Sequence, residues 1–135
     1  MKQMLIGLGV MLMTISCSND TEDKLMGKWQ LREVVSSEGE VQKVDTVWYN
    51  FQNSIFMYQI YDEALESHYR KSYGYNRMEN DRELWIQLIS DPNPVHEFLK
   101  LTDWKENPCT FTIDKLTRKE LIMSGNGRQY VFRKF

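Results

Sequence analysis

The stretch Leu25-Met26-Gly27-Lys28-Trp29-Gln30-Leu31 opens the folded part of the chain and decides its architecture. From residue 27 to residue 35 the side chains alternate, with Trp29, Leu31 and Val35 on one face and mostly polar residues between them. Glu33 interrupts the pattern. Period-two alternation with one apolar face is typical of a half-buried antiparallel strand. The chain is therefore expected to enter its fold as a β-strand.

The remainder of the chain repeats this pattern of short strands separated by turns. Strands are expected at residues 27–35, 41–51, 55–61, 69–77, 84–89, 95–104, 110–116, 120–124 and 128–135. In the segment 95–104, Val95, Phe98 and Leu101 also stand at helical spacing, and we favour the strand. The pair Asn126-Gly127 is typical of a type I′ hairpin. Turn signals every ~8–12 residues without a long helix indicate an all-β antiparallel sandwich or barrel.

Length and composition indicate one packed domain. The chain has 135 residues, a length that favours a single domain. Hydrophobic residues make up 41% and charged residues 27%, which separates the chain from disordered sequences. The formal net charge is −2, so the composition lacks the basic excess typical of nucleic-acid-binding proteins.

The first residues are typical of an export signal. Lys2 precedes an apolar run at residues 5–15, which is shorter than the ~20 residues that span a bilayer and fits a secretory signal peptide. The run ends in Thr14-Ile15-Ser16-Cys17, which resembles the lipobox of bacterial lipoproteins. The resemblance implies cleavage before Cys17 and acylation of its thiol. We expect a lipoprotein signal peptide at 1–16, an acylated flexible tether at 17–24 and the folded domain at 25–135. An ordinary signal peptide with an incidental cysteine is the alternative.

The tether indicates a compartment. Ser18 rather than Asp follows Cys17, so the inner-membrane retention signal known from enteric lipoproteins is absent. The polar and acidic residues 18–23 resemble the surface-export tether of Bacteroides-type lipoproteins. We therefore expect an outer-membrane lipoprotein that faces the periplasm or the cell surface and is held to the membrane through acylated Cys17.

Two motifs of the folded domain carry a family resemblance. Gly27-Lys28-Trp29 resembles the Gly-x-Trp of the lipocalin and lipocalin-like families. The closing pattern at residues 111–121 and Tyr130-x-Phe132-x-Lys134 is similar to the terminal hairpins of small lipocalin-like lipoproteins of Bacteroides-type bacteria. The resemblance implies a small up-and-down β-barrel of about eight strands. It also implies structural roles for Gly27 and Trp29, with Trp29 plugging the closed end and a basic residue of the last strand stacking across it. Arg133 is the expected partner and Arg128 the second choice.

Amphipathic aromatic residues are concentrated in the middle of the chain. In the segment 69–77 one face carries aromatic and basic side chains, and the other carries small polar ones. Lining a cavity, such residues would suit a small apolar or amphipathic ligand whose polar ends meet hydroxyl and amino groups. The candidate ligand-binding residues are Trp48, Tyr58, Tyr69, Lys71, Tyr73, Tyr75 and Trp85. The alternative is that these residues fill the core and form cross-strand pairs of a small barrel.

The sequence shows no catalytic constellation. His68 and His96 are the only histidines, and they would form a metal site with a carboxylate only if the fold brought them together. Cys109 lies in an apolar, strand-like run and is expected to be a small buried residue. We expect no enzymatic activity, no cofactor and no metal. Two functions remain: a lipid-anchored binding module for a small ligand, or an envelope interaction or structural protein with a filled barrel.

Overall fold

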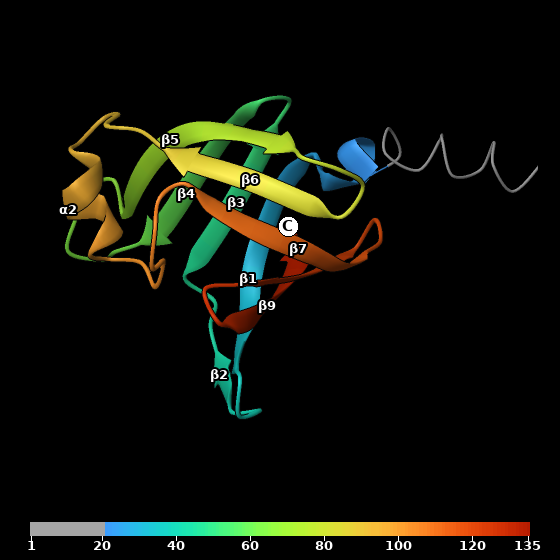
Figure 1. The fold of residues 1–135 in the computed structure, drawn as a ribbon. Coiled ribbons are helices and arrows are strands. Elements are labelled where there is room, and N and C mark those ends of the chain that lie inside the picture. Colours follow the sequence, from blue (N-terminus) through green and yellow to red (C-terminus); the bar gives the residue numbers. More distant parts are fainter. Residues whose placement is uncertain (1–20) are drawn as a thin grey trace, which may run out of the picture.

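Eight antiparallel strands close into a barrel in the computed structural model, which describes residues 21–135 (Figure 1). The strands are β1 (Gly27–Ser36), β3 (Val47–Gln52), β4 (Ile55–Tyr61), β5 (Tyr69–Met78), β6 (Glu83–Leu88), β7 (Cys109–Leu116), β8 (Glu120–Gly125) and β9 (Arg128–Lys134). Each pairs with the next along the chain, and β9 returns to β1 to close the sheet. This order confirms the all-β, up-and-down barrel. Cys17 and the expected signal peptide lie outside the described residues.

A further short strand lies beside the barrel wall. β2 (Val41–Lys43) pairs with the second half of β1, and the two form a ribbon that projects away from the barrel (Figure 1). The single strand expected at 41–51 is therefore divided by residues 44–46. β1 itself contains a bulge between Leu31 and Glu33, which shifts the alternation so that Val34, and not Val35, is buried. The bulge explains why Glu33 interrupts the sequence pattern.

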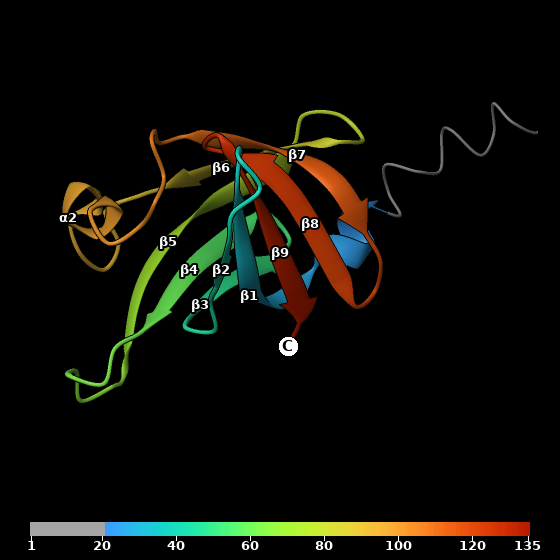
Figure 2. The same ribbon diagram turned by 90° about the horizontal axis from the view of Figure 1, so that it is seen from below.

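The expected strand at 95–104 is wrong, because this segment forms the short helix α2 (Val95–Leu99) followed by an irregular loop. β6 pairs directly with β7, so the sheet offers no free edge to an inserted strand. The helical spacing of Val95 and Phe98 places the ring of Phe98 against Tyr58, with centroids 5.4 Å apart. Helix and loop lie at one end of the barrel, beyond the ends of the strands (Figure 2). We call this the open end.

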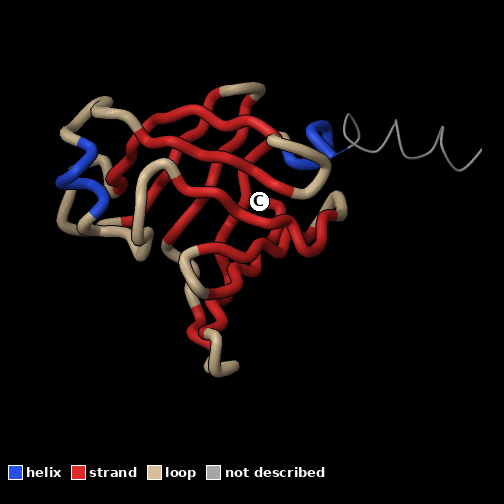
Figure 3. Tube along the Cα trace, viewed as in Figure 1, coloured by secondary structure: helices blue, strands red, loops and turns tan. Residues whose placement is uncertain are grey.

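A helical turn at residues 21–25 lies at the opposite, closed end. Leu25 is buried, and its carbonyl accepts a hydrogen bond from Trp29 Nε1 at 2.7 Å. Figure 3 shows these two helical segments at the two ends of an otherwise stranded domain. Residues 21–24, which the sequence assigned to the tether, are helical here, so the expected domain boundary falls inside this turn.

Aromatic rings fill the interior of the barrel. Tyr49, Phe56, Phe111, Tyr130 and Phe132 are fully buried and come from β3, β4, β7 and β9. The ring centroid of Tyr49 lies 5.3 Å from Phe56, 4.8 Å from Phe132 and 6.3 Å from Phe111. Ring pairs at these separations stabilise the fold by more than the burial of their apolar area alone. The core is therefore a continuous aromatic cluster centred on Tyr49.

Candidate functional site

The closed end is built around Trp29, which is fully buried. The basic residue that crosses its ring is Lys134, whose Nζ lies 4.5 Å from the ring centroid. The expected partner, Arg133, is wrong. Side chains alternate along β9, so Arg133 points outward while Lys134 shares the inner face with the buried Phe132. Arg128, the second choice, lies at the other end of the same strand.

Gly27 makes room for this lysine. Its φ of +122° lies in the region that favours glycine, and a Cβ at this position would lie 2.6 Å from Lys134 Nζ. Lys134 also donates a hydrogen bond to the carbonyl of Met26. Burial lowers the pKa of Lys134, and the nearby Arg118 acts in the same direction. The missing side chain of Gly27 thus leaves space for Lys134, and the ring of Trp29 contacts its amine.

At the open end, the side chain of Trp104 covers the mouth of the barrel. Trp104 belongs to the loop between α2 and β7 and not to a barrel strand. Trp104 is 7% exposed, and its Nε1 donates to the hydroxyl of Tyr49 at 2.8 Å. Its ring centroid lies 5.7 Å from those of Tyr58 and Phe111 and 6.3 Å from that of Phe56. A side chain of a loop therefore occupies the mouth of the barrel.

A hydrogen-bonded cluster beside Trp104 ties this loop to the β8–β9 turn. The carboxylate of Asp103 accepts from Arg128 at 3.1 Å and from the Tyr130 hydroxyl at 2.9 Å. In the turn, Asn126 accepts from the backbone N–H of Lys105 at 2.9 Å and donates to the Tyr130 hydroxyl at 3.1 Å. The side chains of Arg128 and Asp103 are 35% and 29% exposed, so this cluster lies at the rim of the mouth.

Burial keeps the hydroxyl groups at this end protonated. Desolvation raises the pKa of Tyr49 well above its usual value, and the neighbouring Tyr58 adds to the effect. Desolvation also raises the pKa of Tyr58 and of Tyr130, with a further contribution from the Asp103 carboxylate in both cases. The mouth therefore combines apolar walls with neutral hydroxyl groups. This chemistry suits hydrogen bonding rather than proton transfer near neutral pH.

Of the seven candidate ligand-binding residues, Tyr58 faces the barrel interior and the others face outward. The outward-facing set is Trp48, Tyr69, Lys71, Tyr73, Tyr75 and Trp85. On β5 the interior side carries the small residues Ser72, Gly74 and Asn76, all buried. The physical reason is volume, because rings from the other strands already fill the interior. At Gly74 a Cβ would lie 2.0 Å from a carbonyl oxygen of β6. Ligand binding by the outward-facing residues stays a prediction, now located on the outer wall.

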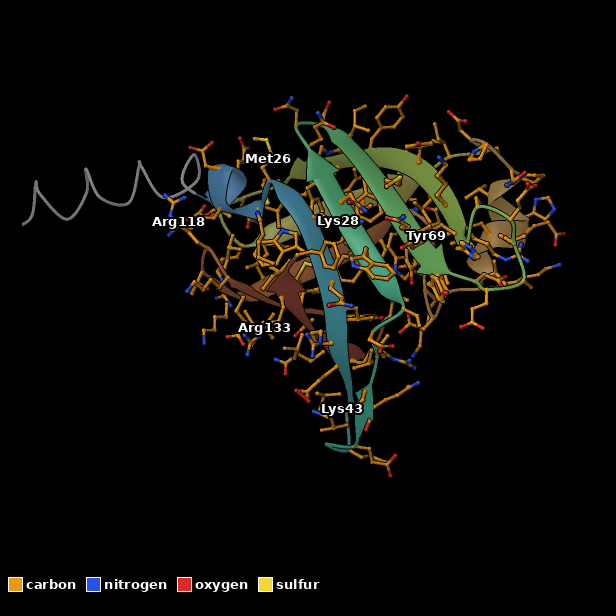
Figure 4. All side chains as sticks on the ribbon, turned by 180° about the vertical axis from the view of Figure 1, so that it is seen from behind. Met26, Lys28, Lys43, Tyr69, Arg118 and Arg133 are labelled. Carbon is orange, nitrogen blue, oxygen red and sulfur yellow. The ribbon has the colours of Figure 1, made fainter. Side chains whose placement is uncertain are left out.

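Some of these residues form a cluster on the outer wall, separate from the core. The ring of Trp48 lies edge-on to Tyr69, at 5.8 Å, and to Phe135, at 5.9 Å. Lys28 Nζ lies 5.4 Å from the centroid of Trp48 and 4.8 Å from that of Phe135. Lys28 and Tyr69 are labelled on this face in Figure 4. The cluster buries Trp48, whose Nε1 finds no hydrogen-bond partner among the described residues.

The two histidines are exposed, whereas the described cysteine, Cys109, lies beside the rim cluster, with its thiol donating to Asn126 Oδ1 at 3.6 Å. His68 is exposed and stacks on Tyr61 with centroids 6.2 Å apart, and His96 is exposed on α2, 3.3 Å from Glu97. Cys109 is buried, and desolvation raises the pKa of its thiol to about 11. Within residues 21–135 no group of three or more His, Cys, Asp or Glu side chains is placed to hold a metal ion.

Three hollows formed by described residues lie at the surface of the barrel. One of about 510 Å³ lies at the closed end between the helical turn and residues that include Phe51 and Met78. Two others, of about 540 and 200 Å³, adjoin the β1–β2 ribbon and the β8–β9 turn. Tyr49 and Trp104 line none of these three. Trp104, which is 7% exposed and in ring contact with Tyr58 and Phe111, fills the mouth of the barrel.

Three residues of these sites were missed from the sequence. Trp104 and Asp103 fell in the segment expected to be a strand, although the surrounding run from Thr102 to Pro108 is mostly polar. A single Trp in a polar run between prolines is a signal for a loop that buries one side chain. The alternation of side chains along a strand places Lys134 on the inner face, since it lies two and four residues after the apolar Phe132 and Tyr130.

The sequence and fold of this chain are similar to those of known proteins. The chain matches a family model described as a lipocalin-like domain over residues 11–135. The chain belongs to the lipocalin-like family. No curated protein matches this lipocalin-like chain. Among residues 21–135, no helix is both long enough and apolar enough to cross a membrane.

Two solved structures are similar to this lipocalin-like domain. A lipocalin-like protein from Bacteroides uniformis ATCC 8492 is 30% identical, with a TM-score of 0.68, over 83% of this chain and 99% of that one. An uncharacterized protein from Bacteroides eggerthii DSM 20697 is 31% identical, with a TM-score of 0.67, over 82% of this chain and 98% of that one. Both neighbours are covered almost completely, so the similarity extends over the whole domain.

Proposed function

We propose that this lipocalin-like protein is a lipid-anchored binding module of the cell envelope, acylated at Cys17, that takes a small apolar or amphipathic ligand at the mouth of its barrel. The observation that supports the proposal is the origin of Trp104. A loop side chain, and not a strand residue, fills the mouth, and its indole N–H is held by the buried hydroxyl of Tyr49. A ligand enters by displacing this loop.

The groups that Trp104 covers define the chemistry of such a ligand. Rings of Phe56 and Phe111 offer apolar contact, and the hydroxyls of Tyr49 and Tyr58 offer hydrogen bonds. A flat molecule with one polar end matches this combination. The Asp103 contacts that hold the loop are partly exposed, and the buried hydrogen bond from Trp104 to Tyr49 joins two neutral groups, so each contributes only about 1 kcal/mol. A ligand that buries comparable apolar area therefore competes with the loop.

Titration with a fluorescent fatty-acid analogue tests the ligand site. Removing the plug in Trp104→Ala should tighten binding of the probe by about ten-fold or more, which corresponds to ~1.4 kcal/mol of loop displacement. Ile55→Ala removes an exposed apolar side chain of the outer wall and is the control, with binding unchanged. If Trp104→Ala binds the probe no better than the wild type, the mouth is not the site.

Replacing Cys17 by Ala tests the anchor. Metabolic labelling with palmitate should mark the wild-type protein and not the variant, and the variant should lose the acyl chains that hold the protein on the outer membrane. Fractionation of cells measures the result. A variant that remains in the outer-membrane fraction without a lipid label would contradict anchoring at Cys17.

A second candidate function is an envelope interaction or structural protein that holds no small ligand. The complete burial of Tyr49, Phe56, Phe111, Tyr130 and Phe132 favours it, because a barrel filled by its own rings leaves the outer wall as the working surface. Native mass spectrometry of protein purified from its source separates the two functions. A co-purifying small molecule supports the ligand site, and a bare polypeptide mass supports the filled barrel.

A further inference from the structure

The closed end carries a group of basic and apolar side chains that the ligand site does not use. We define the closed-end patch as Met26, Lys28, Arg118, Lys119, Arg133 and Phe135. Phe135 is 71% exposed and Met26 is 38% exposed. Backbone hydrogen bonds from Lys134 to Lys119 and from Phe135 to Lys28 bring its segments together. Met26, Lys28, Arg118 and Arg133 are labelled in Figure 4, from the blue β1 to the red-brown β9 and the loop before β8.

The cations of this patch form no close ion pair among the described residues, although Arg133 lies near enough to Glu120 to help lower the pKa of that carboxyl. None of the ion pairs within residues 21–135 includes Lys28, Arg118, Lys119 or Arg133. Glu120, which stands opposite Arg133 in the β8–β9 ladder, is bound to Lys115 at 2.7 Å. Besides Glu120, the acidic residues at the same end are on the helical turn at 21–25 and around the β5–β6 loop. The patch therefore presents positive charge beside exposed apolar side chains.

The position of Cys17 in the sequence brings this end of the barrel to the membrane. Four residue steps separate Cys17 from Thr21, a reach of ~14 Å at full extension. Thr21 begins the helical turn that lies on the closed end. An acyl chain on Cys17 thus limits the distance between the closed end and the bilayer, but it leaves the tilt of the barrel free.

We infer that the closed-end patch is a second membrane contact, which lies on a bilayer bearing anionic phospholipid headgroups and points the open end of the barrel away from it. The inference rests on the acylation of Cys17 in the proposed function. Basic side chains next to an anionic leaflet are attracted within about a Debye length, and an exposed aromatic ring favours the interfacial region. One lipid anchor and one basic patch together give stable, oriented attachment.

Energy transfer on vesicles tests the orientation. The acylated protein is reconstituted on phosphatidylcholine vesicles with and without about one third phosphatidylglycerol. A donor dye is placed at the closed end through Ser54→Cys or at the tip of the β1–β2 ribbon through Ser37→Cys, and the acceptor is on lipid headgroups. On anionic vesicles we expect the transfer efficiency at residue 54 to be about twice that at residue 37 or more.

Charge reversal tests whether the patch is responsible. A triple variant that combines Arg118→Glu, Lys119→Glu and Arg133→Glu tests this role. It should reduce the energy-transfer efficiency at residue 54 to its value on neutral vesicles. The matched control reverses Lys43, Lys71 and Lys100, exposed cations outside the patch, and should leave it unchanged. Flotation of the vesicles separates the two proposals. Protein that does not float refutes the anchor, whereas protein that floats with equal transfer at both sites refutes the oriented contact.

Two further outcomes also count against the inference. If the transfer at residue 54 is high on neutral vesicles and insensitive to the charge reversal, the short tether alone sets the orientation. If the patch variant loses a co-purifying protein while its transfer is unchanged, the partner of the patch is that protein and not the membrane. Loss of the near-ultraviolet circular dichroism of the buried rings identifies a variant that has failed to fold, and single reversals then replace the triple variant.

Discussion

The contact between Lys134 and Trp29 decides how the closed end is sealed. A charged amine over an indole ring gains ~0.5–2 kcal/mol, and the carbonyl of Met26 accepts a hydrogen bond from this amine. Burial opposes the charged amine, as its lowered pKa indicates. The ring and the carbonyl offset that cost, so the charge can lie across the end of the core.

Lys134→Met should lower the free energy of unfolding by about 1–2 kcal/mol, because it removes the ring contact and leaves the Met26 carbonyl without its donor. Arg133→Met is the control on the adjacent, outward face and should change it by no more than ~0.5 kcal/mol. Urea denaturation measures both values. Equal losses in the two variants would show that Arg133 shares the role.

Gly27→Ala should destabilise the protein more than Gly39→Ala. Both glycines have positive φ, which costs an alanine ~1–3 kcal/mol. At Gly27 the new Cβ also displaces the Lys134 amine, whereas nothing lies within 4 Å of a Cβ at Gly39. The expected difference is about 1 kcal/mol, the size of the ring contact that is lost. Thermal unfolding of the two variants checks it, and equal melting temperatures would contradict the steric role.

At single residues, the alternation of side chains along a strand predicts which side chains point inward. Trp29 and Phe132 mark the inner faces of their strands, so the inward-facing base of β9 follows from counting in twos and is Lys134. The choice of Arg133 ignored that count. Trp104 is different, since no periodicity points to a loop residue. Its burial depends on where the loop passes, which is a property of the folded barrel.

The loop at 100–108 is an element whose position depends on side-chain contacts rather than on a backbone ladder. Asp103, Trp104 and Lys105 are each bound by a group of the barrel. Elements with few backbone ladders open locally at lower free energy than the strands around them. This loop is therefore the part of the mouth that moves most readily.

Asp103→Asn should increase the opening of this loop. The variant loses the charged acceptor of Arg128 and Tyr130, at an expected cost of about 1 kcal/mol because the pair is partly exposed. Amide hydrogen exchange at residues 104 and 105 should accelerate about five-fold, the factor that corresponds to this energy. Asp114→Asn removes an exposed carboxylate of β7 and is the control. Unchanged exchange in Asp103→Asn would show that the contacts of Asp103 do not limit the opening of the loop.

At the level of elements, alternation predicted the strands well and failed where two periods fit. In the segment 95–104, Val95 and Phe98 stood at helical spacing while residues 98–102 suited a strand, and the direct pairing of β6 with β7 excluded the strand. On β5 the strand was correct, and the face assumed to line a cavity was wrong. Tyr73 and Tyr75 point outward because Ser72 and Gly74 occupy the little space left inside.

The interior of the whole molecule holds three buried tyrosines, and their raised pKa values couple folding to alkaline pH. A tyrosine whose proton is held more tightly in the native state contributes stability that is complete below the unfolded pKa of ~10. That contribution is lost as the pH rises above this value. Tyr49, Tyr58 and Tyr130 all shift in this direction, mainly through desolvation.

The protein should therefore lose stability steeply above pH ~10, by up to ~1.4 kcal/mol per pH unit for each tyrosine involved. Denaturant titrations between neutral and alkaline pH measure this slope. Tyr58→Phe should reduce it, because one of the three groups is removed, whereas Tyr75→Phe, on the outer wall, should leave it unchanged. A slope that is the same in both variants would contradict the role of the interior.

Whether the barrel is hollow is a property of the whole molecule that composition does not determine. The same count of aromatic residues supports a lined cavity or a filled core, and the difference is the direction in which each strand presents its rings. That direction depends on how much volume the other strands have already taken. The sequence therefore predicted the barrel and its closed end, but not the plug at its mouth.

The pairing of β9 with β1 also sets the order of events as the chain folds. β9 begins about 100 residues after β1, so the barrel stays an open sheet with two unpaired edges until the last strand has emerged. Pairing across so long a separation is slow compared with the formation of neighbouring hairpins. The barrel therefore cannot close before its final strand is available, whereas hairpins between neighbouring strands can form earlier.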